Sequence, residues 1–184
     1  MDRRISKTEQ AIQEAFFQLL KNVPADKITI KQLCQEANIS RGTFYAHYED
    51  YPAFLFSLHN LLIHRYMETF SVYHFDKNTE DFLQKQFETI RENRNLFSLL
   101  FLPGFDSVRD QCMQAEKELI LPAWLSRSDI SPEEAEVIFT FMIHGMFAIY
   151  RLWLRSDFSM DEKEIIQLMD NVGKFGVYHY IYKK

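Results

Sequence analysis

Cysteine, glycine and proline are scarce in this chain of 184 residues, which contains two, five and five of them respectively. Cys34 and Cys112 lie far apart, so they exclude a disulfide-rich scaffold and a zinc site with four thiolate ligands. So few glycines and prolines exclude collagen-like, linker-rich and turn-dense all-β chains. Apolar residues make up 47% of the sequence, which is enough for a sizeable core and excludes a disordered chain.

Motifs of enzymes are also missing. The sequence has no glycine-rich phosphate loop, no nucleophile elbow and no dinucleotide fingerprint. His59 and His64 are five residues apart, which suits shared metal ligation poorly, and the other histidines have no carboxylate at a metal-ligand spacing. We therefore predict a protein that is not an enzyme, with no catalytic residue, metal site or cofactor. A redox-sensing role for the Cys112 thiol stays an alternative.

One stretch needs a membrane test. Residues 137–154 are mostly apolar, but they include His144 and Arg151, and three glutamates lie just before them. A membrane-spanning helix needs about 20 apolar residues with few or no charges. Because His144 and Arg151 share a helix face, we predict a helix buried on most sides in protein. The start of the sequence, residues 1–7, has no apolar signal segment, so we expect a cytoplasmic protein with no membrane partner.

Charge is unevenly distributed along the chain. The formal net charge of −5, taken alone, argues against binding to nucleic acid. Residues 3–48, however, hold seven basic and four acidic residues, so this segment carries +3 and the rest of the chain −8. A basic segment joined to an acidic remainder predicts two parts with different tasks.

The hydrophobic pattern is helical almost throughout. Apolar residues recur three to four positions apart, and no alternating pattern of useful length predicts a strand. The predicted fold is all-α, with about nine helices, at 5–23, 30–37, 41–48, 50–73, 79–92, 94–102, 106–125, 132–156 and 161–181. We expect a three-helix domain at residues 1–50 and a larger helical bundle at residues 51–184.

Residues 29–55 carry the strongest functional signal. Thr29 and Ser40 are predicted to cap two short helices, and Asn38 between them tolerates the left-handed backbone of a tight turn. This layout is a helix-turn-helix, whose second helix enters the major groove of DNA. We expect Phe44 and Tyr48 to face inward. The residues expected to lie toward the outside are then Arg41, Gly42, Thr43, Tyr45 and His47.

The segment resembles the DNA-binding region of the TetR (tetracycline-repressor) family of bacterial one-component regulators. The matching residues are Thr29, Leu33, Ala37, Ile39, Ser40, Gly42, Thr43, Phe44, Tyr45, His47, Tyr48 and Leu55. Farther along, residues 90–97 and 151–154, with Gly145, resemble a Firmicutes-type C-terminal subgroup of the family. The resemblance implies a sequence-specific DNA-binding transcriptional regulator, most often a ligand-responsive repressor.

The resemblance also implies the DNA contacts. Arg41 and Thr43 have the chemistry to read base edges, and Tyr45 matches a position that usually touches phosphate. The full set of implied contacts is Thr29, Lys31, Ser40, Arg41, Gly42, Thr43, Tyr45, His47 and Tyr51. Tyr51 stands where the family usually has a phosphate-contacting lysine, so we expect only a weaker, uncharged hydrogen bond from its hydroxyl.

The last two predicted helices are apolar on more than one face, which predicts burial against their own domain and against something else. In the family, these helices form a four-helix interface with their symmetry mates. The resemblance therefore implies a homodimer that binds double-stranded DNA at a palindromic operator. The expected interface residues are Ile138, Met142, Gly145, Ile149, Trp153, Val172 and Phe175.

Aromatic residues make up 15% of the chain, and many fall in the middle helices. We expect an unknown small-molecule effector, apolar or aromatic, to bind between residues 60 and 150, although core packing accounts equally for any single aromatic residue. The candidate pocket residues are Tyr66, Phe70, Phe97, Phe101, Trp124 and Met142. The alternative hypothesis is a helical protein-interaction adaptor or a small-molecule-binding protein that does not bind DNA.

Overall fold

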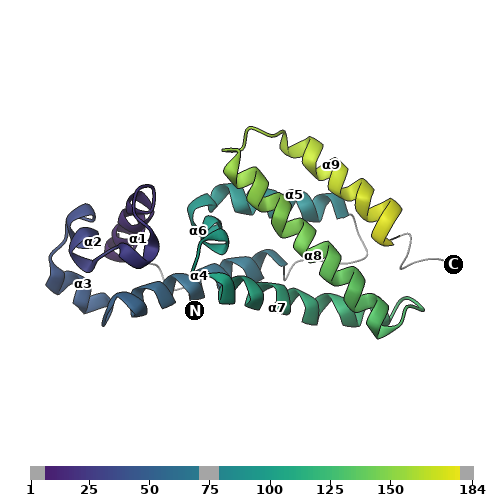
Figure 1. The fold of residues 1–184 in the computed structure, drawn as a ribbon, viewed down its shortest axis with the longest axis horizontal. Coiled ribbons are helices and arrows are strands. Elements are labelled where there is room, and N and C mark those ends of the chain that lie inside the picture. Colours follow the sequence, from purple (N-terminus) through teal and green to yellow (C-terminus); the bar gives the residue numbers. More distant parts are fainter. Residues whose placement is uncertain (1–6, 71–78, 179–184) are drawn as a thin grey trace. The chain divides into compact units, whose positions relative to one another are not determined.

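The computed structural model describes residues 7–70 and 79–178, and every regular element in these ranges is helical (Figure 1). The described α-helices are α1 (Lys7–Leu19), α2 (Ile30–Glu36), α3 (Arg41–His47), α4 (Tyr51–Phe70), α5 (Thr79–Glu92), α6 (Arg94–Ser98), α7 (Asp106–Leu125), α8 (Pro132–Arg155) and α9 (Glu162–Val172). Short 3₁₀ turns lie at Ala25–Lys27 and Leu99–Phe101, and a π-helical turn follows α9 at Gly173–Tyr178. The predicted all-α class is confirmed. The ends predicted at residues 73 and 181 lie outside the described ranges.

The chain divides into two compact units, Met1–Leu61 and Leu62–Lys184, which we call the N-terminal and C-terminal units. The division falls inside α4, after Leu61. The sequence pattern predicts an earlier end of the first domain, at residue 50. Packing explains the difference. Phe54, in the first turn of α4, is 0% exposed and belongs to the aromatic core of the N-terminal unit.

The core of the N-terminal unit is built around rings. The ring centroid of Phe54 lies 5.3 Å from that of Phe16, 5.2 Å from that of Tyr48 and 6.3 Å from that of Phe44. Edge-to-face and tilted ring pairs add to the stabilisation that burial supplies. Leu33 of α2 is also 0% exposed, so α1, α2, α3 and the start of α4 share one core.

Short-range hydrogen bonds set where α2 and α3 begin. The Thr29 hydroxyl accepts a hydrogen bond from the backbone N–H of Gln32 at 3.3 Å, and the Gln32 side chain accepts one from the Thr29 N–H at 2.9 Å. Ser40 caps α3 by accepting a hydrogen bond from the backbone N–H of Thr43 at 3.0 Å. Asn38 has a φ of 53°, in the left-handed region. The predicted caps and turn residue are therefore confirmed.

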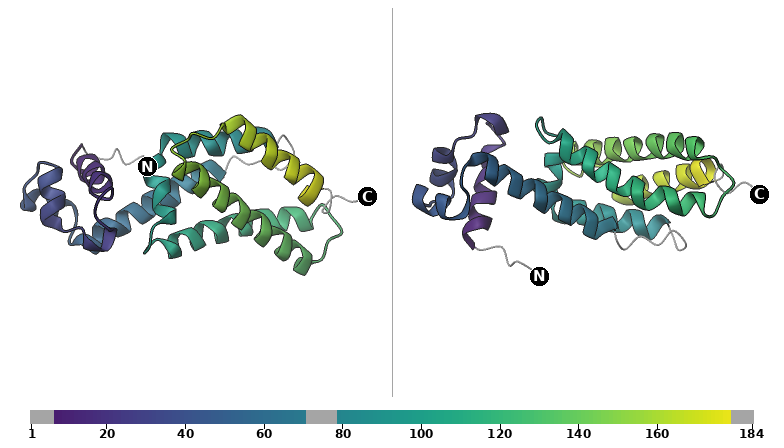
Figure 2. Two further views of the ribbon diagram at one scale, coloured as in Figure 1. Left: turned by 45° about the horizontal axis from the view of Figure 1, so that its top comes forward. Right: turned by 90° about the horizontal axis from the view of Figure 1, so that it is seen from below.

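The C-terminal unit is a bundle in which α5 packs on α9 and α7 packs on α8 (Figure 2). One ion pair joins each pair of helices: Arg91 contacts Glu162 at 2.6 Å, and Lys117 contacts Glu136 at 2.6 Å. These pairs are partly exposed to solvent, which weakens them, so apolar burial contributes most of the packing energy.

Within the described residues, α8 is the one helix long and apolar enough to cross a membrane by length and composition. Only 39% of its most apolar window is buried, so the predicted burial on most sides is too strong. The buried side is nevertheless continuous, and its residues are Ala135, Phe139, Ile143, Phe147, Tyr150, Trp153 and Leu154. A helix with a long buried side in a protein core passes the same test of composition, so α8 is weak evidence for a membrane span.

Two phenylalanines on α4 test the importance of the aromatic core. We expect Phe54→Ala to lower the free energy of unfolding by about 3–5 kcal/mol, because the ring is fully buried and its removal leaves a cavity. Phe56→Ala is the matched control, since that ring is 64% exposed, and it should change stability by less than about 0.5 kcal/mol. Urea denaturation measures both values. Equal effects of the two substitutions would contradict the packing described here.

Candidate nucleic-acid interface and ligand cavity

The N-terminal unit turns one side of α3 outward. Phe44 is 0% exposed and Tyr48 is 8% exposed, whereas Tyr45 between them is 53% exposed. The inward and outward sides of α3 therefore match the prediction. Among the predicted contact residues on α3 and around α2, Thr43 is half-buried, and the exposed ones are Thr29, Lys31, Ser40, Arg41, Gly42, Tyr45 and His47.

Lys31 of α2 and Arg41 of α3 are exposed basic residues. Within the described ranges, neither side chain forms an ion pair with a carboxylate. The Arg41 charge acts on the nearby Cys34 thiol, although burial is the stronger influence and raises the pKa of that thiol. Arg3 and Arg4, which contribute to the basic segment, lie outside the described residues. Unpaired basic side chains beside a short outward helix are suited to phosphate and base contacts.

Three hydroxyl groups in the predicted contact set, those of Thr29, Ser40 and Thr43, already have structural roles. The Thr29 hydroxyl donates to the Gln32 side chain at 2.7 Å, and the hydroxyls of Ser40 and Thr43 are hydrogen-bonded to each other at 2.9 Å. These side chains hold the helix starts, so any contact to DNA would add to a capping function. Gly42 leaves the surface open, since an added Cβ would meet only the Ser40 hydroxyl at 3.6 Å.

His47, at the last turn of α3, is directed toward α1. Its Nδ1 atom lies 3.4 Å from a carboxylate oxygen of Glu9. This contact ties the end of α3 to α1, and it constrains the side chain that the sequence assigned to DNA contact.

Tyr51 takes part in a contact that the sequence does not reveal. Its hydroxyl donates a hydrogen bond of 2.6 Å to the backbone carbonyl of Ala25. Burial, with the Asp26 charge as a smaller influence, raises the pKa of Tyr51 to about 12. The single hydroxyl proton is used inside the unit, so donation to a phosphate would require this bond to break.

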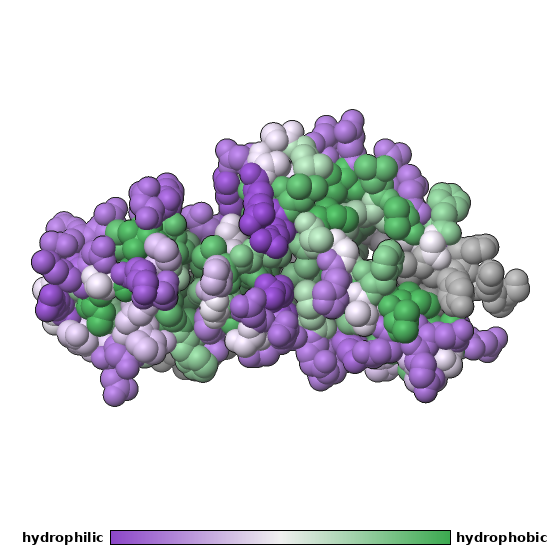
Figure 3. Space-filling model, in the orientation of Figure 1, coloured by the Kyte–Doolittle hydropathy of each residue, from purple (hydrophilic) through white to green (hydrophobic). Residues whose placement is uncertain are grey.

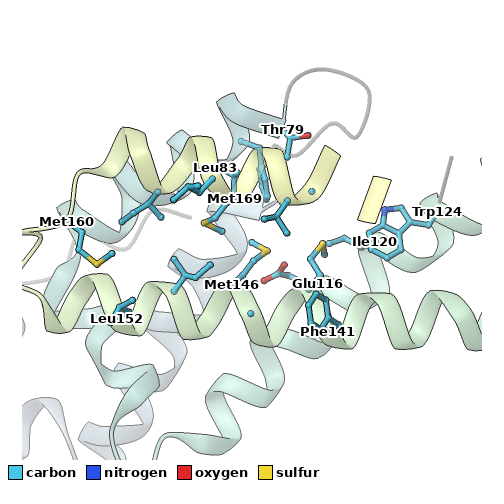
Figure 4. A pocket seen from close by; sticks show the side chains of 18 residues that line it. Thr79, Leu83, Glu116, Ile120, Trp124, Phe141, Met146, Leu152, Met160 and Met169 are labelled. Carbon is cyan, nitrogen blue, oxygen red and sulfur yellow. The ribbon is translucent and has the colours of Figure 1, made fainter. Parts of the chain in front are cut away.

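The C-terminal unit contains an apolar cavity of about 400 Å³ between α5, α7, α8 and α9 (Figure 4). Trp124 and Met142 of the predicted pocket set line it. Glu116, which is not among the predicted pocket residues, lines it as well. A signal was present: Glu116 stands between Cys112 and Ile120 at four-residue spacing, which places a carboxyl within an apolar helix face.

Three other predicted pocket residues lie elsewhere. Tyr66, Phe97 and Phe101 line a separate cavity of about 10 Å³, which is too small for an effector. They pack into the aromatic core instead, with the Tyr66 ring 6.5 Å from Phe97 and 5.9 Å from Phe147. The side chain of Phe70 lies outside the described part of the structure.

Apolar side chains also gather on the outside of the C-terminal unit, over α8 and α9 (Figure 3). We call them the α8–α9 surface: Val137, Phe141, Leu152, Leu168, Val172 and Phe175, each more than half exposed. Four of them also line the cavity, namely Phe141, Leu152, Leu168 and Val172.

The predicted dimer residues divide between this surface and the interior. Val172 and Phe175 are exposed at 62% and 80%. Gly145 is exposed, and Ile138, Met142 and Ile149 are half-buried. Trp153 is only 1% exposed, because its ring packs 4.7 Å from Phe87 and 4.5 Å from Phe158 in the unit's own core. Trp153 is therefore not available to a partner.

A helix-turn-helix unit joined to a helical unit with an apolar cavity is the architecture of a one-component transcriptional regulator. A family model described as a transcriptional regulator C-terminal region, of the TetR type, matches residues 77–174, more than half of the chain. The chain belongs to the TetR family of transcriptional regulators, as the sequence motif predicted. Regulators of this family bind DNA and are generally not enzymes.

Solved structures share the fold across both units. The fatty acid degradation regulator FadR from Bacillus halodurans is 11% identical, with a TM-score of 0.68, covering 92% of this chain and 96% of its own. A TetR transcriptional regulator from Streptococcus agalactiae 2603V is 24% identical, with a TM-score of 0.60 and coverage of 91% and 94%. NalD, the secondary repressor of the MexAB-OprM multidrug efflux pump in Pseudomonas aeruginosa, is 17% identical, with a TM-score of 0.65 and coverage of 89% and 91%. No curated protein matches this chain in sequence.

The hydrogen bond from Tyr51 to Ala25 predicts a structural effect of Tyr51→Phe. We expect the free energy of unfolding at pH 7 to fall by about 1 kcal/mol and DNA affinity to change less than about twofold. The hydroxyl ionises near pH 10 when unfolded and near 12 when folded, so its stabilisation is present below pH 10 and is lost as the pH rises to 12. Urea denaturation at several pH values measures this difference.

Tyr45→Phe is the control, because it removes an exposed hydroxyl from the same unit and should leave stability unchanged. A tenfold loss of DNA affinity in Tyr51→Phe would contradict a purely structural role for the Tyr51 hydroxyl.

Proposed function

We propose that this protein is a ligand-responsive repressor that binds a palindromic operator as a two-fold homodimer. The observation that carries the proposal is the outward side of α3, where Arg41 and Tyr45 stand exposed in register with the family motif while Phe44 is buried. A symmetric dimer presents two such helices, and a palindromic site matches that symmetry.

The α8–α9 surface supports the homodimer. Monomeric proteins rarely expose apolar patches of this extent, and such a patch on the last two helices suits association with a second copy. Ile138, Met142 and Ile149 would extend the surface on α8, and Trp153 is left out of it. The proposed location is the cytoplasm, with no membrane partner.

The cavity supports regulation by a small molecule. Its volume of about 400 Å³ falls within the usual range for ligand sites, and its walls are predominantly apolar. A ligand that binds one arrangement of the protein better than another shifts the population toward it, and DNA affinity changes with that shift. The proposed direction of regulation is repression of transcription. It agrees with the role of NalD, a repressor that shares the fold.

The competing hypothesis is a helical adaptor or small-molecule-binding protein without DNA binding. The net charge of −5 and the internally bonded Tyr51 hydroxyl favour it, because both weaken attraction to phosphate. The exposed, unpaired Lys31 and Arg41 favour the regulator. DNA binding by the intact chain therefore decides between the two.

Substitution of the outward residues of α3 tests DNA binding directly. We expect Arg41→Ala and Tyr45→Ala each to lower affinity for the chain's own upstream DNA by about tenfold or more, since each removes a base or phosphate contact. Folding and oligomeric state should be unchanged. Gel-shift titrations at two salt concentrations measure the affinity.

Lys21→Ala is the matched control for charge, because it removes a basic side chain from the same unit outside α2 and α3. Its effect should be clearly smaller than that of Arg41→Ala. Binding that is absent for the wild-type chain at low salt, or equally reduced by all three substitutions, would count against specific recognition through α3.

The dimer is tested on residues that do not line the cavity. We expect Val137→Asp and Phe175→Asp each to shift the protein toward monomer at micromolar concentration, because each places a charge in an apolar interface. Light scattering measures the molar mass. Leu119→Asp on α7 is the control, since that side chain is 43% exposed and lies outside the α8–α9 surface. A wild-type protein that is monomeric under these conditions would overturn the dimer.

A further inference from the structure

Glu116 is a buried carboxyl on the wall of the cavity. It lies on α7, is 1% exposed, and its side chain is directed into the cavity beside Met146 and Phe141 (Figure 4). The Oε1 atom is buried and has no hydrogen-bond partner within residues 7–70 and 79–178. A buried polar atom without a partner costs free energy, so such an atom in a cavity indicates a partner that arrives from outside the chain.

The surroundings of Glu116 favour its uncharged form. Among the described residues, no cation forms an ion pair with this carboxyl, and burial raises its pKa well above the ordinary value. The neighbouring Tyr150 hydroxyl is also buried, and it donates its proton to the Gln86 side chain. A protonated carboxyl has an O–H group, which makes Glu116 a hydrogen-bond donor toward the cavity.

Trp124 supplies a second donor in the same cavity. Its side chain is 1% exposed, it lines the cavity from α7, and its indole N–H is buried without a partner. The indole group donates and never accepts. Apart from these two groups and Thr79, the described residues that line the cavity are apolar or glycine. The site therefore offers donors to a ligand within mainly hydrophobic walls.

We propose that the cavity selects an uncharged, mostly apolar molecule with a carbonyl-type oxygen, and that Glu116 determines this specificity by donating a hydrogen bond to that oxygen. Ketones, esters and aldehydes with an aromatic or aliphatic body have this chemistry. The proposal rests on the regulatory function above, since it names the class of effector that the cavity takes.

Charged ligands fit the cavity less well. A cationic ligand would require Glu116 to ionise, and both charges would lose their hydration in an apolar cavity, a cost that one ion pair barely offsets. An anionic ligand would find no cation among the described side chains that line the cavity. An uncharged acceptor satisfies the buried donor without bringing a charge into the interior.

Three probes built on the same naphthalene ring system test the proposal on the full chain without DNA. They are 1-acetylnaphthalene with a carbonyl, 1-methylnaphthalene without a polar group, and 1-naphthylmethylamine with a positive charge at pH 7.5. Isothermal titration calorimetry measures each Kd. We expect the acetyl compound to bind about five- to tenfold more tightly than the methyl compound, the effect of one hydrogen bond, and the amine to bind most weakly.

Variants of Glu116 then assign the selectivity. Glu116→Gln keeps an N–H donor and should keep most of the preference for the acetyl compound, whereas Glu116→Leu should reduce the preference to below about twofold. Binding of 1-methylnaphthalene to Glu116→Leu should be retained, which shows that the cavity is intact. Glu118→Gln, an exposed glutamate on the same helix, is the matched control and should behave as wild type.

Three results would overturn the proposal. In the first, the amine binds most tightly of the three probes and its binding is lost in Glu116→Gln. In the second, Glu116→Leu keeps the full preference for the acetyl compound. In the third, no probe binds up to its solubility limit. None of these results depends on operator binding, which the substitutions on α3 test separately. Failure of the ligand class and failure of the regulatory function are therefore distinguishable.

Discussion

Burial of the Phe44 ring is the constraint on which the DNA-facing surface depends. The ring packs with Tyr48 and Phe54, and successive residues of a helix turn by about 100° around its axis. Once Phe44 and Tyr48 are held in the core, Tyr45 is turned out of it and is 53% exposed. Arg41 lies one turn before Phe44 and is exposed as the first residue of α3. The orientation of the recognition helix is thus a consequence of packing among aromatic rings, and its exposed residues need no further positioning force.

Local features of this fold are predictable from sequence because local interactions cause them. Thr29, Asn38 and Ser40 act through backbone groups only a few residues away, so their identities are enough to place α2, the turn and α3. Tyr51 shows that contacts between residues far apart in the chain are not predictable in this way. Its partner, the carbonyl of Ala25, lies 26 residues earlier in the chain, and no pattern in the sequence brings the two together.

The same limit explains the errors in the C-terminal unit. Periodicity shows that α8 has two apolar sides, but not which one meets the core, so it does not reveal that Trp153 is buried within its own unit. Aromatic composition does not separate residues that fill space from residues that surround it, which is why Tyr66 and Phe97 fall outside the large cavity. Where helices leave a gap depends on packing between elements distant in the chain.

Phe141, Leu152, Leu168 and Val172 belong both to the α8–α9 surface and to the cavity wall. In the proposed dimer, a second copy covers side chains that also enclose the ligand. Escape of the ligand then depends on loosening between subunits, so its residence time is linked to the lifetime of the dimer. Adaptation to a new effector is restricted for the same reason, because a substitution that reshapes this wall also alters the contact between subunits.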